Sequence, residues 1–406
     1  MAPPLYSSYR TRERLFQQHN LSAPYPNGKH AKYLWMANHG TQQGWGNYMQ
    51  EMVLNAYLAY ASGRAYVFDN FTWEEGGPEI ADWNGHAIPA RIPLSAFISG
   101  PIIGGPMPPM SKDIIPRAVS REWYHKVCPE PDRVVIDTRK IQNSFLTLPS
   151  ALQIVERWVD ELRKIQSPCV ELARSSPWLF GWDLTNTERV LDIFPDLSSS
   201  PILTHFDWSP LIHGQFLINS HHFIPSNLRS PDLYDIRTPI PGLLVLHVRR
   251  GDYEGWCSYI AMSWGLVYNG FNRFPQFPDK SPAPHDPEGL HHCLPSIPDM
   301  VAKVQSVVND TGYPLTKVFI MTNAKAPWLT DLVNAIAKIH VWPDGISTSR
   351  DLALSWDGRF VSQAVDMLAA QRAEVFIGNG WSSLTSNIAM LRMTNSNLDP
   401  RNTRFW

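Results

Sequence analysis

The second half of the chain alternates between short apolar runs and longer segments that are apolar on one face only. Short apolar runs are typical of buried strands, and a period near 3.6 residues is typical of helices. Alternating strands and helices predict a parallel sheet with helices on both faces, whose ligands bind at the carboxyl ends of the strands. The predicted elements are strand 242–248, helix 297–308, strand 317–321, helix 327–338, strand 339–342, helix 359–372, strand 374–378 and a helix from about 383.

The first half of the chain begins with a similar unit. Apolar runs at 32–36 and 65–68 predict two buried strands. Between them, apolar residues recur with helical spacing from Met49 to Tyr60, and Asn47 is well placed to cap that helix. The pattern predicts a strand–helix–strand unit with a glycine-rich first turn.

A length of 406 residues exceeds what one hydrophobic core usually organises, which favours two domains. The regular alternation starts at Gly242, and Pro231, Pro239 and Pro241 precede it. These prolines place the domain boundary near residues 230–241. We therefore expect an α/β protein with an N-terminal arm (1–30), an N-terminal lobe (31–236) and a C-terminal lobe (237–406).

The composition excludes several classes of partner. Only 18% of the residues are charged and the net charge is -2, so the chain lacks the basic surface that nucleic acids require. Its apolar stretches are shorter than the roughly 20 residues of a membrane-spanning helix, and no signal peptide is visible at its N-terminus. We expect no nucleic-acid partner and no transmembrane segment.

The cellular compartment stays open at this point. Four cysteines, an even number, are compatible with two disulfides. Three Asn-x-Ser/Thr sequences, at Asn20, Asn70 and Asn309, fit a secretory route. The expected compartment is the lumen of the secretory pathway (ER or Golgi) if a leader has been removed, and otherwise the cytoplasm.

The polar cluster His247–Asp252 directly follows the apolar strand at 242–248 and marks the predicted ligand edge of the sheet. An arginine such as Arg249 can grip a phosphate with two parallel hydrogen bonds, and His247 can bond a ribose or phosphate oxygen. For Arg250 we favour an ion pair with Asp252 that braces the turn. The cluster predicts an anionic ligand.

A second cluster, Gly378–Thr385, contains a turn with glycines followed by hydroxyl residues that open a helix. Amides at a helix N-terminus, together with the hydroxyls of Ser382 and Ser383, suit a diphosphate, although helix capping by either serine is the alternative. The chain has no Asp-x-Asp sequence, the motif that usually binds the divalent metal ion of a nucleotide diphosphate. We predict no metal site, so arginine and backbone amides would neutralise the diphosphate.

These motifs resemble the GDP-fucose protein O-fucosyltransferase family, nearest to the type that modifies folded epidermal-growth-factor-like repeats. The motifs are Gly44-Trp45-Gly46-Asn47, His247–Asp252, Val365-Asp366, Phe376–Asn379 and Ser382–Thr385. The resemblance implies the GT-B architecture, which consists of two Rossmann-like lobes with a cleft between them. GDP-fucose would be held mostly by the C-terminal lobe, and the N-terminal lobe would form the acceptor side.

The resemblance also assigns roles to single residues. Arg249 would contact the β-phosphate, His247 the nucleotide, Ser382 and Ser383 the phosphates, Asp366 the guanine donors, and Asn47 the donor substrate from the N-terminal lobe. The other expected substrate-binding residues are Gly44, Trp45, Gly46, Val248 and Leu384. Two positions depart from the family pattern, because Leu384 replaces an aromatic residue that meets the guanine and Trp45 stands where arginine is common.

The implied reaction is a metal-independent, inverting transfer of fucose that uses no cofactor besides the donor substrate GDP-fucose. Departure of GDP builds negative charge on the β-phosphate, so Arg249 is the expected catalytic arginine. Glu51 lies one helical turn past Asn47 and is the nearest carboxylate that could take the acceptor proton. The alternative for Glu51 is a solvated carboxylate near the positive end of a helix.

The motifs do not specify the acceptor. We expect Ser or Thr of a protein. The alternatives are a glycan acceptor, or a non-catalytic GDP-sugar or glycan-binding protein of the same fold. The resemblance further implies a Cys257–Cys293 disulfide, which leaves Cys128 and Cys169 to pair by exclusion.

Overall fold

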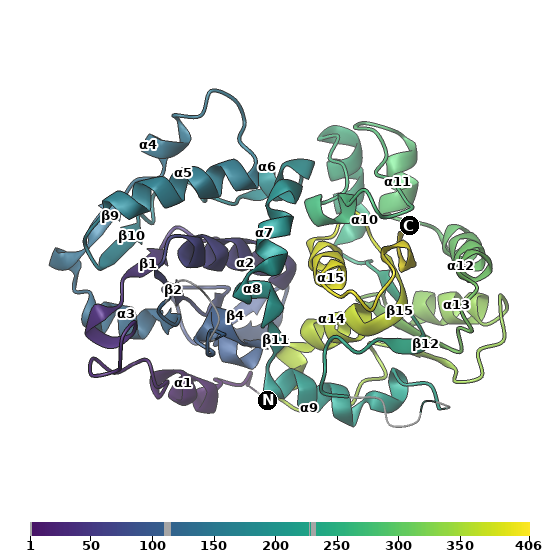
Figure 1. Cartoon of the computed structure of the whole chain (residues 1–406). Helices are drawn as coiled ribbons and strands as arrows, with labels where there is room; N and C mark the ends of the chain where they lie inside the picture. Colours follow the sequence, from purple (N-terminus) through teal and green to yellow (C-terminus); the bar gives the residue numbers. More distant parts are fainter. Residues whose placement is uncertain (1, 109–114, 227, 229–232) are drawn as a thin grey trace. The chain divides into compact units, whose positions relative to one another are not determined.

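A computed structural model describes residues 2–108, 115–226, 228 and 233–406 (Figure 1). Its residue contacts divide the chain into two compact units. The first unit contains Met1–Thr185, Arg189–Ile212 and Trp356–Val361, and the second contains Asn186–Glu188, His213–Ser355 and Ser362–Trp406. The arm at 1–30 and the division at residue 236 stay predictions, and Pro231, which helped to place that division, lies outside the described residues.

The first unit is built on a five-stranded parallel sheet with the strand order β8-β2-β1-β10-β9. Its strands are β1 (Tyr33–Met36), β2 (Ala65–Phe68), β8 (Val119–Ser120), β9 (Val134–Ile136) and β10 (Cys169–Leu172). The sequence predicted β1 and β2 correctly, because both are continuous apolar runs. On one face of β1, Tyr33 and Trp35 pack with Tyr124 of α3 (Arg121–Val127).

The first unit also contains two long helices, α2 (Trp45–Ala61) and α5 (Ala151–Lys164), which pack against each other. Helix α5 begins as expected after Ser150, whose side chain forms a reciprocal capping box with Gln153. The predicted capping role of Asn47 is wrong, because α2 already begins at Trp45. Trp45 stacks on Phe97 with 3.9 Å between ring centroids, and this contact draws the first turn into the core.

The other α-helices and strands of the first unit are short. They are α1 (Ser7–Arg14), β3 (Phe71–Thr72), β4 (Ile80–Trp83), β5 (His86–Pro89), β6 (Arg91–Ile92), β7 (Ile98–Ser99), α4 (Arg139–Gln142), α6 (Trp182–Thr185), α7 (Phe194–Ser199), α8 (Pro201–Thr204) and β11 (Asp207–Trp208).

The second unit contains another five-stranded parallel sheet, in the order β14-β13-β12-β15-β16. Its strands are β12 (Ile240–Val248), β13 (Lys317–Thr322), β14 (Ile346–Thr348), β15 (Ala373–Gly378) and β16 (Thr403–Phe405). The predicted strand at 339–342 is wrong. Trp342 instead turns back to donate a hydrogen bond to the Ile336 carbonyl, and the edge strand beside β13 is β14.

Helices cover both faces of this second sheet (Figure 1). Helices α12 (Ile297–Thr311) and α13 (Ala326–Ile336) share one core with Leu244, Leu246 and Val248 of β12. Helices α14 (Ser362–Arg372) and α15 (Ser383–Met393) pack on the opposite face. The remaining helices are α9 (Pro210–Ile218), whose first residues belong to the first unit, α10 (Tyr253–Cys257) and α11 (Glu288–Cys293).

Both disulfides form as expected. Cys128 pairs with Cys169 in the first unit, and Cys257 pairs with Cys293 in the second. The second disulfide joins α10 to α11, so it fixes the long connection between β12 and α12. No helix in the described part of the chain is long and apolar enough to span a membrane.

Arg392 provides a test of how the second sheet holds α15. Its guanidinium is buried and donates hydrogen bonds to the carbonyls of Ala370 (3.1 Å) and Ala373 (2.6 Å) and to Thr403 Oγ1 (2.9 Å). We expect Arg392→Met to lower the free energy of unfolding by about 3 kcal/mol, because buried acceptors lose their donor. Urea unfolding measures the loss. Exposed Arg401→Met is the control, and equal midpoints for both variants would contradict the assignment.

Candidate functional site

Arg249 lies at the carboxyl edge of the second sheet, one residue after β12 ends. Its Nε and Nη2 donate hydrogen bonds to the two carboxylate oxygens of Asp252, at 3.1 and 2.6 Å. The guanidinium lies 4.9 Å from the ring centroid of Tyr253. Asp252 is 45% exposed and Arg249 33% exposed, so water and ligands reach this pair. An anion can therefore replace the carboxylate at little cost.

The expected ion pair between Arg250 and Asp252 is wrong. The chain turns at Gly251, whose φ of +65° is a left-handed conformation, and this turn brings Asp252 back to Arg249. The Arg250 guanidinium instead lies 4.3 Å from the ring centroid of Trp328 and donates a hydrogen bond to the Pro295 carbonyl. Arg250 braces the turn, as the sequence suggested, but through different partners.

His247 connects β12 to the first turn of α15. Its Nδ1 lies 2.7 Å from Thr385 Oγ1, which also accepts a hydrogen bond from the Asn379 amide. Burial and the neighbouring Arg249 charge lower the pKa of His247 to about 3, so the ring is neutral.

The turn between β15 and α15 is tightly packed. A Cβ at Gly378 would lie 2.3 Å from a Thr385 methyl carbon, and a Cβ at Gly380 would lie 2.3 Å from the Tyr268 ring. Asn379 Nδ2 donates a hydrogen bond to the Cys293 carbonyl at 2.6 Å, which ties the turn to the disulfide-bonded connection. Glycines at these positions thus allow the chain to bring the N-terminus of α15 to the sheet edge.

The N-terminus of α15 is not capped by a side chain. Ser382 occupies the cap position, is buried, and makes no capping hydrogen bond, so the capping alternative is wrong for this serine. The first backbone amide that bonds back into the helix is that of Ser386, to the Ser382 carbonyl. The amides before it have no acceptor within the helix and can bind an anion. Ser383 and Leu384 are partly buried in this turn.

Asp366 on α14 carries a carboxylate oxygen that is buried without a hydrogen-bond partner among the described residues. The other oxygen accepts a hydrogen bond from Ser349 Oγ at 2.8 Å. Burial raises the pKa of Asp366 to about 7, although Ser349 and the charge of Arg350 act in the opposite direction. A buried acceptor of this kind is stabilised when a ligand donates a hydrogen bond to it.

Val248, also expected in the site, is 1% exposed and packs in the core shared with α12 and α13. Its carbonyl accepts a hydrogen bond from Thr322 Oγ1 at 2.6 Å. The second unit brings together His247, Arg249 and the Ser382–Ser383 turn, because the contact between His247 and Thr385 joins the end of β12 to the start of α15. The expected residues Gly44, Trp45, Gly46, Asn47 and Glu51 belong to the first unit.

The first unit has a buried charge network at the carboxyl edge of its own sheet, which the sequence analysis did not identify. His39 Nε2 lies 3.2 Å from Asp69 Oδ2, which also accepts a hydrogen bond from Trp35 Nε1 at 2.7 Å. Arg121 pairs with the other oxygen of Asp69 at 3.2 Å. Each of His39 and Asp69 follows a buried strand closely, which is the signal that could have identified them.

Glu51 is buried in α2 and holds the loop that precedes this helix. Its Oε2 accepts hydrogen bonds from the Gly40 amide at 2.9 Å and from Gln43 Nε2 at 3.4 Å. Burial raises the pKa of Glu51, while the charge of His39 and these hydrogen bonds act against that rise. The alternative of a solvated carboxylate is therefore wrong. Asn47 is partly buried in the same helix.

In the described ranges, no three His, Cys, Asp or Glu side chains are grouped so that they could hold a metal ion. The chemistry that these side chains offer is anion binding in the second unit, through Arg249 and the first amides of α15.

No protein-family model and no curated protein matches the sequence. Solved structures share its fold. The crystal structure of POFUT1 in complex with GDP-fucose is 15% identical, covers 92% of this chain and 98% of its own, and has a TM-score of 0.56. The complex of POFUT1 with GDP is 15% identical, has the same coverage and a TM-score of 0.54. NodZ alpha-1,6-fucosyltransferase soaked with GDP-fucose is 14% identical over 89% of this chain and 92% of that chain, with a TM-score of 0.40.

The likeness to POFUT1 and the two parallel sheets confirm the predicted α/β fold, with two Rossmann-like lobes of the GT-B type. The resemblance indicated by the sequence motifs is thereby supported at the level of the fold. A fold does not by itself determine an activity.

The charge network predicts a pH-dependent stability. Burial lowers the pKa of His39, but the charge and hydrogen bond of Asp69, together with Glu51 and the Gly40 carbonyl, more than offset this and raise the pKa to about 9. A raised pKa adds stability that is complete below the ordinary value of 6.5 and is lost as the pH rises through about 9. We therefore expect the wild-type protein to lose stability over this pH range.

Urea unfolding at both ends of that range, on the wild-type protein and on His39→Gln, measures the effect. The variant lacks the titrating imidazole, so its stability should fall less with rising pH. Because tyrosines titrate equally in both proteins, the difference between the two slopes isolates His39. Identical slopes would contradict a protonated His39 in the folded state.

Proposed function

We propose that this protein is a fucosyltransferase that moves fucose from GDP-fucose to an acceptor hydroxyl. One observation carries the proposal, namely the contact between His247 and Thr385, which holds Arg249 and the uncapped N-terminus of α15 at one sheet edge. The likeness of the fold to POFUT1, which was solved in complex with GDP-fucose, supports the choice of this donor.

The diphosphate would bind where Arg249 now meets Asp252. The exposed Arg249–Asp252 pair contributes about 0–1 kcal/mol, whereas a diphosphate offers more charge and the same two-point geometry. The first amides of α15 and the hydroxyls of Ser382 and Ser383 would bind the remaining phosphate oxygens. Arginine and amides together would neutralise the diphosphate without a divalent ion.

The guanine base would be recognised by Asp366. Guanine carries two adjacent donors on one edge, and the unpartnered oxygen of Asp366 is a buried acceptor that such donors can satisfy. His247 would add a hydrogen bond to a nucleotide oxygen. Leu384 offers an aliphatic contact in place of aromatic stacking, so we expect hydrogen bonds to provide most of the selectivity for guanine.

In the reaction, the bond between the sugar carbon and the β-phosphate oxygen breaks, and a bond to the acceptor oxygen forms on the opposite face. The bonding electrons leave with GDP, and Arg249 stabilises the charge that develops on the β-phosphate more in the transition state than in the ground state. The acceptor hydroxyl gives up its proton. We propose Glu51 as the base, because its pKa is raised by burial.

From the first unit, we propose that Asn47 and the backbone of Gly44 and Gly46 contact the donor substrate. Trp45 is buried against Phe97, so its side chain would act by fixing the first turn of α2 rather than by touching substrate. The preferred acceptor is Ser or Thr of a protein.

The donor site predicts the selectivity of nucleotide binding. We expect calorimetry to detect GDP binding in the presence of EDTA, and to detect much weaker binding of ADP and UDP, which lack the two adjacent donors that Asp366 would accept. GDP-fucose should also be hydrolysed slowly when no acceptor is present. A strict requirement for Mn²⁺, or equal binding of UDP and GDP, would refute the proposed donor site.

The two neighbouring arginines should differ when each is replaced by lysine. Arg249→Lys keeps the charge but loses the planar fork, so we expect fucose transfer to fall by about 2–4 kcal/mol of transition-state stabilisation, which is about 30- to 1,000-fold. Arg250→Lys loses its contacts with Trp328 and the Pro295 carbonyl, so the melting temperature should fall with turnover roughly preserved.

Turnover and melting temperature must be measured for both variants. If Arg249→Lys transferred fucose like the wild-type protein, the cluster at 247–252 would be structural and the proposed donor site would be misplaced.

A further inference from the structure

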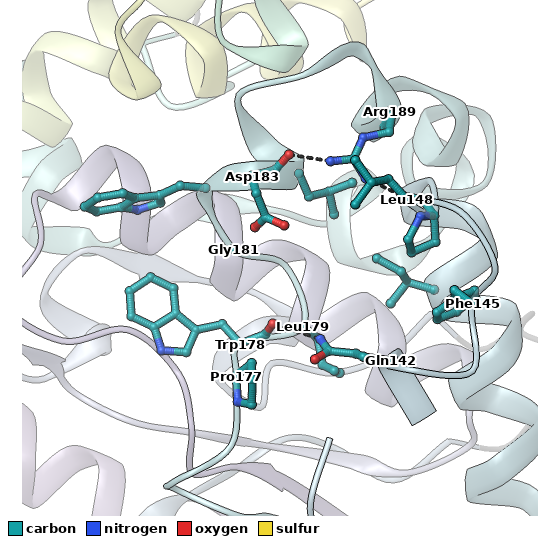
Figure 2. A pocket seen from close by; sticks show the side chains of 13 residues that line it. Gln142, Phe145, Leu148, Pro177, Trp178, Leu179, Gly181, Asp183 and Arg189 are labelled. Atoms are coloured by element: carbon teal, nitrogen blue, oxygen red, sulfur yellow. Dashed lines mark hydrogen bonds between the residues drawn. The ribbon is translucent and has the colours of Figure 1, made fainter. Parts of the chain in front are cut away.

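The first unit contains a pocket of about 530 Å³ that includes none of the residues proposed to bind the donor substrate (Figure 2). One wall comes from the loop after β10, which carries Trp178 and Leu179, and the other from the segment that carries Phe145 and Leu148. The complete lining is Gln142, Phe145, Leu148, Pro149, Ile154, Pro177, Trp178, Leu179, Gly181, Trp182, Asp183, Leu184 and Arg189.

Arg189 and Gln142 of this pocket are bonded to its own backbone, whereas the exposed carboxylate of Asp183 is open to a ligand. Arg189 Nη1 donates a hydrogen bond to the Pro149 carbonyl at 2.6 Å, and Nη2 donates to the Asp183 carbonyl. Gln142 Nε2 donates to the Trp178 carbonyl at 3.1 Å. The surface that remains for a ligand is mostly aliphatic and aromatic. Such a surface favours apolar groups over the closely spaced hydroxyls of a sugar chain.

The rim of the pocket exposes apolar surface to water. Leu148 is 74% exposed and Trp182 is 44% exposed, although both line the pocket. Covering an exposed leucine is favourable by about 1.5–3 kcal/mol. A ligand that brings apolar side chains therefore gains affinity at this rim.

The pocket is connected to the loop that we assign to the acceptor side. Trp182 Nε1 donates a hydrogen bond to Gln43 Oε1 at 3.4 Å, and Gln43 in turn bonds Glu51. Gly40, which lies in the same loop as Gln43, packs against Trp178 of the pocket, since a Cβ at Gly40 would lie 3.0 Å from the Trp178 ring. An acceptor seated in the pocket would thus lie beside Gly44–Asn47 at the start of α2.

We propose that this pocket binds apolar side chains of a polypeptide acceptor, close to the Ser or Thr that receives the fucose. This inference rests on the proposed fucosyltransferase function. It extends that function by selecting a polypeptide over a glycan as the acceptor. The continuity of the pocket with the Gln43–Glu51 contacts and its mostly apolar lining are the two observations that favour this occupant.

The test uses the full chain and a displayed library of short random peptides. Peptides that bind the wild-type protein should be enriched in aromatic and aliphatic residues. A fluorescein-labelled copy of the most enriched peptide should bind Leu148→Asp at least about tenfold more weakly by anisotropy, because the carboxylate is solvated where the peptide must bury apolar surface.

Leu146→Asp is the matched control, because Leu146 is fully exposed, lies two residues away and does not line the pocket. It should leave peptide affinity unchanged within a factor of two, and GDP calorimetry should be unchanged for both variants. Equal peptide affinity of Leu148→Asp and wild type, selected peptides without apolar enrichment, or a loss of binding to arrayed glycans instead of peptides would overturn the proposal. Failure of GDP binding would refute the donor site alone, because peptide binding is measured without nucleotide.

Discussion

The parallel pairing of β12 with β15 is the constraint on which the candidate donor site depends. Leu246 lies opposite Ile377 in this pair, so the two strands end at the same edge of the sheet. The chain after β12 supplies Arg249, and the chain after β15 supplies the N-terminus of α15. The hydrogen bond between His247 and Thr385 then fixes the distance between these two parts. If β12 and β15 were not neighbours, Arg249 and the first amides of α15 would not lie at the same sheet edge.

The charged pairs at the two sheet edges differ in how far their carboxylates are exposed to water. In the second unit, the counter-charge of Arg249 is the half-exposed Asp252, which an incoming anion can displace. In the first unit, the carboxylate Asp69 is itself buried and pairs with His39 and with the half-buried Arg121, and removing a partner from a buried charge is costly. The first arrangement suits a ligand that arrives and leaves. The second suits a loop that must stay in one conformation, which is the loop that Glu51 also holds.

Local patterns predicted the parts of this molecule that local sequence determines. The strands at β1, β2, β12 and β15 are continuous apolar runs, and α5 begins at a capping box. The two polar clusters at 247–252 and 378–385 were visible because each follows a strand directly. Errors arose where distant contacts decide the structure. Asp252 pairs with Arg249 because of the turn at Gly251, and Trp45 starts α2 because it stacks on Phe97. The His39–Asp69 pair was missed because only the strand order brings these residues together.

A crystal structure of the chain with GDP is the most direct test of the donor site. We predict that the β-phosphate lies within hydrogen-bond distance of the Arg249 guanidinium and of the first amides of α15. The guanine donors should meet the Asp366 carboxylate, and the pair between Arg249 and Asp252 should be open. GDP bound away from this sheet edge, or Arg249 still paired with Asp252 in the presence of bound GDP, would contradict the proposed site.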